Sequence, residues 1–204
     1  HMEDLGKFKY NIALPAPSLY GQFNNLDDID YVLTGLKKMG FDQVYEVSRA
    51  AELVSEATRK LMYNPETGMS LPRPVISSAC PAVVLLIRVR FPDLCDHVLP
   101  LKSPMETAAG MAKREAVERT GLPERDIGCF FITPCPAKVT DIQMPLGIDR
   151  SKVDGAIAIS EVFPTLSHTM DRLESIEPIA NSGIIGVGWS TSGGESAALL
   201  NEKY

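Results

Sequence analysis

The sequence predicts an α/β protein in which helices cover a parallel β-sheet. Segments rich in strand-forming residues alternate along the 204 residues with segments of helical periodicity, which is typical of consecutive βαβ units. The stretch Ile127–Thr133 is apolar without alternation, as expected for a strand buried on both faces of a parallel sheet. We therefore expect right-handed crossovers between the strands and helices on both faces.

The first half of the chain contains two predicted strands, each followed by a helix. Tyr10–Leu14 is the first strand, and the helix Asp27–Met39 follows it and ends at Gly40. Phe41–Val47 is the second strand. Ser48 is the expected N-cap of a helix from Arg49 to about Met62. The inward positions of this second helix are Ala50, Leu53, Val54, Ala57 and Leu61.

Proline and capping signals divide the middle of the chain. Pro74–Ser77 is predicted to be a short strand, and Val83–Val89 is apolar enough to be a buried element, which the preceding Pro81 favours as a helix. Ser103 and Glu106 form a capping box with Pro104 at the first helical position. That helix runs to about Thr120 and buries Met105, Ala108, Ala109, Ala112 and Ala116.

The last third repeats the alternation. Val153–Ile159 is a predicted strand, and Ser160 is expected to cap a helix that runs to about Leu173. Gly183–Gly188 is predicted as a last short strand, and Gly193-Gly194 opens a final helix. The stretch Asp141–Lys152 marks a boundary between a first lobe, about residues 3–140, and part of a second lobe, about 150–204.

Composition excludes several classes of protein. Acidic residues outnumber basic ones 26 to 20, whereas nucleic-acid binding needs a basic face, so we expect no nucleic-acid partner. No apolar run approaches the roughly 18 residues of a membrane span, so we expect no membrane association. The four cysteines form no CxxC pair, which is consistent with reduced thiols in the cytoplasm. His1 and Met2 are typical of a cloning scar.

Two cysteines follow predicted strands and are candidates for a metal site. Cys80 and Cys135 each lie beside a proline after a strand, as Ala16-Pro17-Ser18 does, and parallel strands end at one edge of a sheet. A helix begins at Cys80, and its dipole favours the thiolate that iron or zinc needs. Lys138 lies three residues after Cys135 and could reach an anion held there.

Other interpretations of these residues remain open. Cysteine is often a small buried apolar residue, and we interpret Cys95 and Cys129 in this way. Spacing alone leaves that role and a ligand role equally open for Cys80 and Cys135. A lone lysine after a strand is usually solvated. Gly186-Val187-Gly188 does not complete a dinucleotide-binding motif, so a nucleotide site has little support.

Five short motifs, in order, resemble those of the iron-only (FeFe) hydrogenases. Ser77-Ser78-Ala79-Cys80-Pro81 resembles the signature T-S-C-C-P, and Thr133-Pro134-Cys135-Pro136-Ala137-Lys138 resembles M-P-C-x-x-K. Lys102-Ser103-Pro104 matches the family's K-S-P between them. Ala16-Pro17-Ser18 and Gly193-Gly194 are similar to its opening A-P-S segment and its G-G turn.

The resemblance implies a hydrogenase catalytic-domain fold and an H-cluster, in which a 4Fe–4S cubane is bridged to a two-iron unit that carries CO and cyanide. On this basis Cys80 and Cys135 would ligate the cubane. Lys138 would hydrogen-bond one cyanide, and Ala16, Pro17 and Ser18 would line the other. Asp141 occupies a position where the motif has Glu on the proton path.

The sequence departs from the family pattern in ways that matter. Ala79 replaces the cysteine that passes protons to the active iron, and Thr133 replaces a Met that packs on the cluster. The third signature, with two more cysteines in C-x-x-x-C spacing, is absent before Tyr204. We therefore expect residues 3–204 to be a fragment with part of the H-cluster domain, inactive alone and without an intact cluster.

The expected function belongs to the full-length protein. It is the reversible interconversion of H2 with protons and electrons, and the replacement at Ala79 resembles the sensory branch of the family. The partners that this implies are ferredoxin or fused ferredoxin-like modules, with PAS-type or other signalling modules in the parent. The alternative is a non-catalytic iron–sulfur or signalling module with the hydrogenase fold.

Overall fold

A four-stranded parallel sheet forms the centre of the molecule. The computed structural model describes residues 2–24, 26–63 and 71–200. The strands are β1 (Tyr10–Pro15), β2 (Gln43–Val44), β3 (Ile127–Thr133) and β4 (Gly155–Ala158), in the order β2-β1-β3-β4. All three pairings are parallel, which confirms the predicted α/β fold class.

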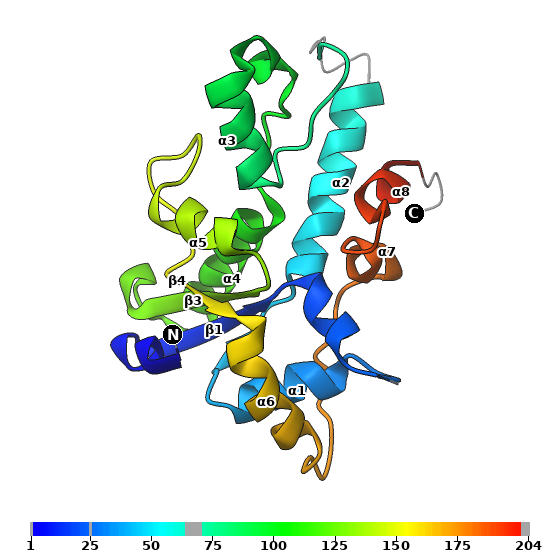
Figure 1. The fold of residues 1–204 in the computed structure, drawn as a ribbon. Helices are drawn as coiled ribbons and strands as arrows, with labels where there is room; N and C mark the ends of the chain where they lie inside the picture. The colour runs from blue at the N-terminus through cyan, green and yellow to red at the C-terminus, as the bar shows by residue number, and fades with distance from the viewer. Residues whose placement is uncertain (1, 25, 64–70, 201–204) are drawn as a thin grey trace.

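Helices cover both faces of this sheet (Figure 1). On one face lie α1 (Asp30–Lys38) and α6 (Ile159–Met170), and on the other lie α2 (Val47–Tyr63) and α4 (Pro104–Thr120). Successive strand side chains point to opposite faces, so neighbours in β3 join different cores. Phe130 packs in the α1/α6 core, whereas Cys129 and Phe131 pack in the α2/α4 core.

Of the three predicted N-cap residues, Ser103 is a cap, whereas Ser48 and Ser160 are not. Ser103 accepts a hydrogen bond from the Glu106 N–H and begins α4, whose predicted inward residues are all buried. Ser48 is not a cap, because α2 begins at Val47 and the Ser48 Oγ bonds instead to the Ser182 Oγ at 2.7 Å. Ser160 is not one either, since α6 begins at Ile159 after an extended Ala158. Leu53 points outward from α2 and is 42% exposed.

The helix α3 (Pro81–Arg90) projects from the body of the molecule together with the 3₁₀ helix η4 (Pro92–His97) (Figure 1). The prediction of a helix here is confirmed, but the prediction that it is buried is wrong. Its apolar side chains on the outer face are exposed by between 41% (Val83) and 67% (Val89). Pro74–Ser77 does not join the main sheet, because only Ile76 forms a bridge, and its partner is Val98.

The last predicted strand is wrong: residues Ile184–Gly188 form helix α7, and Gly194–Leu200 forms helix α8. A short apolar run cannot be assigned to strand or helix from periodicity alone. Tertiary packing decides the matter here, because α7 lies against α2 at the level of Gly186. A Cβ at Gly186 would lie 2.4 Å from the backbone oxygen of Ser48.

Between α6 and α7, residues 177–182 form a return segment, without helix or strand, whose backbone N–H groups are bound by side chains. Asp30 accepts from the N–H groups of Ile179 and Ala180, and Glu46 accepts from those of Asn181 and Ser182. The Thr34 Oγ1 accepts from the Glu177 N–H. These side-chain acceptors hold the segment that leads into α7 against α1 and the start of α2.

The remaining short elements are 3₁₀ helices η1 (Met2–Lys7), η2 (Pro17–Gln22) and η5 (Glu124–Asp126), and helix α5 (Pro136–Gln143). In the part of the chain that the structure describes, no helix combines the length and the apolar character that crossing a membrane requires.

Candidate functional site

The two candidate ligands occupy equivalent local positions. Cys80 is the N-cap of α3 and Cys135 is the N-cap of α5, and each is followed by a proline at the first helical position. Both residues are extended, with φ and ψ near −97° and 106° for Cys80 and −100° and 110° for Cys135. Cys80 is exposed and Cys135 is half-buried, so solvent or a ligand can reach both.

Lys138 connects the loops that carry these two cysteines. Its Nζ donates a 2.9 Å hydrogen bond to the backbone oxygen of Ala79 and lies 3.4 Å from the Asp141 Oδ2. The side chains of Lys138 and Asp141 are only 11% and 12% exposed. An ammonium has three N–H donors. The Ala79 oxygen and the Asp141 carboxylate take two of them, so the third is available for an anion next to the Cys80 loop. Lys138 is therefore not a solvated surface lysine, which was the alternative interpretation.

Two of the three motif segments lie at one sheet edge, as predicted. The Ala16 N–H donates to the Ile132 oxygen at 3.0 Å, so Ala16–Ser18 and Thr133–Cys135 leave neighbouring strands at one sheet edge. Ala16 and Pro17 are buried, and Ser18 is half-buried. Cys80 does not follow a strand of this sheet, and the Lys138 side chain is what joins its loop to α5.

Glu195 also belongs to this region, although no sequence motif points to it. The Ser77 Oγ donates to the Glu195 Oε1 at 2.5 Å, and the Ala79 N–H donates to the same Ser77 Oγ at 3.2 Å. Helix α8 is thereby tied to the loop before Cys80. The G-G turn marked the start of this helix, but no local signal points to a partner 118 residues away.

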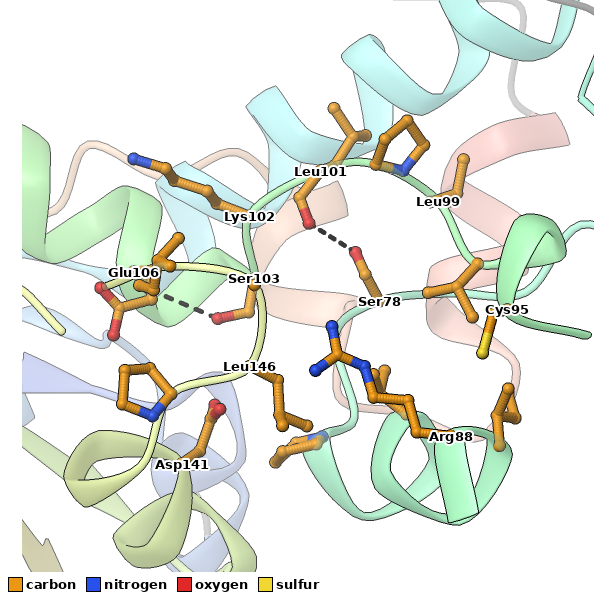
Figure 2. Close-up of a pocket in the computed structure, with 18 residues that line it drawn as sticks. Ser78, Arg88, Cys95, Leu99, Leu101, Lys102, Ser103, Glu106, Asp141 and Leu146 are labelled. Carbon is orange, nitrogen blue, oxygen red and sulfur yellow. Dashed lines mark hydrogen bonds between the residues drawn. The ribbon is translucent and has the colours of Figure 1, made fainter. Parts of the chain in front are cut away.

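A cavity of about 490 Å³ lies between α3 and the α5 end, next to this loop (Figure 2). Ser78, Leu99 and Asp141 are among its lining residues, and Figure 2 shows the Arg88 guanidinium pointing into it. Asp141 therefore lies between the cavity and Lys138. Cys95 also lines the cavity and is exposed, which contradicts its predicted burial.

Cys129 does belong to the core, as predicted. It is fully buried in β3, and burial raises the pKa of its thiol far above the usual range. Its side chain packs among apolar residues of the α2/α4 core and is closed off from solvent and from an incoming metal. Cys129 is therefore no substitute for a missing cluster ligand.

The donor set for a cubane is incomplete within the described residues. A 4Fe–4S cluster needs four thiolates, and the motifs place two here, Cys80 and Cys135. Among residues 2–24, 26–63 and 71–200, no group of three or more His, Cys, Asp or Glu side chains could hold a metal ion. The residues present do not complete the cluster site, and two further thiolates would have to come from elsewhere.

Comparison with known proteins identifies relatives of this chain. A model of the family "iron only hydrogenase large subunit, C-terminal domain" matches residues 9–204. The NADP-reducing hydrogenase subunit HndD of Solidesulfovibrio fructosivorans is 28% identical over 148 residues, which are 70% of this chain and 23% of that protein. Iron hydrogenase 1 of Clostridium pasteurianum is 24% identical over 166 residues, 77% of this chain and 28% of that one.

Solved structures support the same fold. A variant of the [FeFe]-hydrogenase HydA1 from Chlamydomonas reinhardtii superposes with a TM-score of 0.74 at 23% identity, covering 98% of this chain and 55% of that one. The chain spans about a quarter of the length of the two hydrogenases compared above. Because the family model matches nearly the whole chain, the chain belongs to the family of C-terminal domains of iron-only hydrogenase large subunits.

Proposed function

We propose that this chain supplies two of the four thiolates of an H-cluster cubane, Cys80 and Cys135, in an FeFe-hydrogenase-like protein that interconverts H2 with protons and electrons. The observation that carries the proposal is the Lys138–Ala79 hydrogen bond, which joins the two cysteine loops. A hydrogen bond between the loops restrains the two thiolates relative to each other. Lys138 and Ala16–Ser18 would contact the anionic ligands of the two-iron unit.

The full-length protein is proposed to be a hydrogen sensor. Ala79 has no side-chain proton to transfer, and Leu99 is apolar where the aligned family segment has Ser. Asp141 keeps a carboxylate near Lys138, so part of a proton path is retained. A slow sensory protein tolerates poor proton delivery, whereas an enzyme of high turnover does not.

This role also suggests the cellular context of the protein. Residues 3–204 would be part of the H-cluster domain of a cytoplasmic protein. That protein would exchange electrons with ferredoxin or with fused ferredoxin-like modules. PAS-type or other signalling modules in the parent would carry the output.

A second candidate is a non-catalytic iron–sulfur module. The observation that favours it is a match to the cytosolic Fe-S cluster assembly factor nar1 of Emericella nidulans, 31% identical over 97 residues, or 47% of this chain. Ala79 is compatible with either candidate, since neither a sensor nor an assembly module needs fast turnover.

Anaerobic reconstitution with iron, sulfide and an external thiol tests the ligands. We expect Cys80→Ser and Cys135→Ser each to lower the bound iron at least about 10-fold, because a hydroxyl is a poor ligand for a cluster iron. Cys95→Ser is the matched control, since Cys95 is also exposed, and it should leave the iron content unchanged. Equal loss in all three variants would contradict the assignment.

Hydrogen evolution separates the two candidates in a longer parent protein that carries the third cysteine signature. A slow sensor with a lost relay should gain turnover when Ala79→Cys restores it. We expect a gain of about 10-fold at equal cluster occupancy, below the roughly 10²–10⁴-fold typical of positioned acid–base groups, because Leu99 and Asp141 also alter the path. No hydrogen activity in either form would favour the non-catalytic module.

A further inference from the structure

The cavity of about 490 Å³ beside α3, here called the α3 cavity, is separate from the cysteine site. Among the described residues that line it, Cys80, Cys135 and Lys138 are absent. Its apolar lining comes from α3, from the segment after η4 and from the loop after α5: Val84, Ile87, Leu99, Leu101, Leu146 and Ile148. Binding sites for small molecules typically have volumes of about 300–1,000 Å³ and mostly apolar walls. The α3 cavity has both properties.

Most polar groups that line the α3 cavity already have partners within the protein. The Ser78 Oγ donates to a backbone oxygen at 2.8 Å, and the Asp141 carboxylate lies beside the Lys138 ammonium. The Glu106 carboxylate accepts two hydrogen bonds from residues 151–152. These groups therefore contribute few free donors to a ligand.

Arg88 is the exception. Its guanidinium points into the α3 cavity (Figure 2), and within the described part of the chain it makes no hydrogen bond or ion pair. The side chain reaches across to the opposite wall, because its Nη2 lies 3.8 Å from the position that a Cβ would take at Gly147. Lys102 also lines the cavity, but Figure 2 shows its ammonium pointing away from the Arg88 guanidinium. Arg88 thus brings a planar fork of unused N–H donors to an apolar cavity that is open to solvent.

We propose that the α3 cavity binds a small monocarboxylate with an apolar chain. The fork of Arg88 matches the two oxygens of a carboxylate, and such charge-assisted pairs are among the stronger hydrogen bonds in proteins. The chain of the ligand would lie on the leucine and isoleucine walls and lose its contact with water. A dianion such as phosphate fits less well, because the carboxylates of Asp141 and Glu106 line the same cavity and disfavour a second negative charge.

The proposal goes beyond the proposed function, because it requires no cluster and no hydrogen chemistry. It is tested on the chain without iron. Cys80→Ser, which should lower the bound iron, should leave carboxylate binding unchanged, since Cys80 does not line the α3 cavity. The two proposals can therefore fail independently.

Calorimetric titration with hexanoate provides the first test. We expect saturable 1:1 binding, with hexanol and inorganic phosphate each bound at least about 10-fold more weakly, because one lacks the charge and the other lacks the chain. Arg88→Met should weaken hexanoate binding at least about 10-fold. Arg90→Met is the matched control, since Arg90 is an exposed arginine on the same helix that does not line the cavity, and it should have no effect.

Alkylation of the cysteines by iodoacetamide, followed for each cysteine by mass spectrometry, provides the second test. Cys95 lines the α3 cavity and is exposed, whereas Cys80 is exposed but outside the cavity. At about ten times the Kd of hexanoate, about nine-tenths of the sites are filled, so modification of Cys95 should slow about 10-fold. Modification of Cys80 should keep its rate.

Four outcomes would overturn the proposal. The first is the absence of saturable hexanoate binding, and the second is equal loss of binding in Arg88→Met and Arg90→Met. The third is hexanol or phosphate binding as tightly as hexanoate, because the site would then not select a carboxylate with a chain. The fourth is binding that leaves the alkylation of Cys95 unchanged, because the ligand would then lie elsewhere.

Discussion

Lys138 and Ala79 lie 59 residues apart in the sequence, yet the Lys138 Nζ donates a 2.9 Å hydrogen bond to the Ala79 backbone oxygen. This bond makes one structural unit of two loops that the motifs mark separately. Asp141 completes the arrangement by accepting from the same ammonium. The residue that the family resemblance assigns to an anionic ligand is thus also the residue that holds the site together.

Lys138→Met should loosen the Cys80 loop. The change leaves the Ala79 oxygen and the Asp141 carboxylate without their partner, and a buried hydrogen bond to a charged group contributes about 1.5–3 kcal/mol. We expect the free energy of unfolding to fall by about 2 kcal/mol and exchange in residues 77–81 to rise. Lys152→Met removes a half-exposed ion pair with Glu124 and serves as the control, with a loss below about 0.5 kcal/mol in a urea titration.

Glu46→Ala should release the return segment. Its carboxylate is buried and accepts the N–H groups of Asn181 and Ser182, so truncation removes the acceptor of both donors. We expect a loss of about 3 kcal/mol, and about 1 kcal/mol for Glu46→Gln, which keeps one acceptor oxygen. Glu56→Ala at an exposed position of α2 should change the urea midpoint little. Equal effects of Glu46→Ala and Glu56→Ala would contradict the described role.

Gly186→Ala should displace α7 from α2, because its methyl group would lie 2.4 Å from the Ser48 backbone oxygen. We expect a loss of about 2–3 kcal/mol, as for overpacked sites. Gly188→Ala in the same helix meets nothing within 4 Å and should be neutral or slightly stabilising. Thermal unfolding of the two variants measures the difference, and equal midpoints would show that α7 does not pack as described.

Tyr20→Phe should reduce the loss of stability in alkaline solution. Burial, and secondarily the nearby Glu46, raise the pKa of Tyr20 far above its ordinary value near 10. Stability from the neutral phenol is complete below about pH 10 and falls as the pH rises further, since only the unfolded chain ionises there. Urea titrations from pH 8 to 11 should show a flatter decline for Tyr20→Phe, and an unchanged one for the exposed Tyr31→Phe.

Sequence periodicity predicted the elements that local physics controls. β3 is apolar without interruption and is buried, and the Ser103-Pro104 start of α4 combines a cap with a proline at the first helical position, so both were predicted close to their true bounds. The motif order also indicated the family, which the match over residues 9–204 confirmed. The short run Ile184–Gly188 was assigned to the wrong class, because its partner α2 is distant in sequence.

The sequence by itself determined the parallel α/β class, the long helices and the cysteine motifs, because capping, apolar periodicity and strand composition act over a few residues. Only the tertiary structure decided how the site is assembled. Lys138 binds Ala79, Glu195 binds Ser77, and Glu46 holds the return segment, across separations of 59, 118 and 135 residues. The physical reason is that a hydrogen bond between residues far apart in the sequence depends on where packing places them, and no local pattern encodes that position.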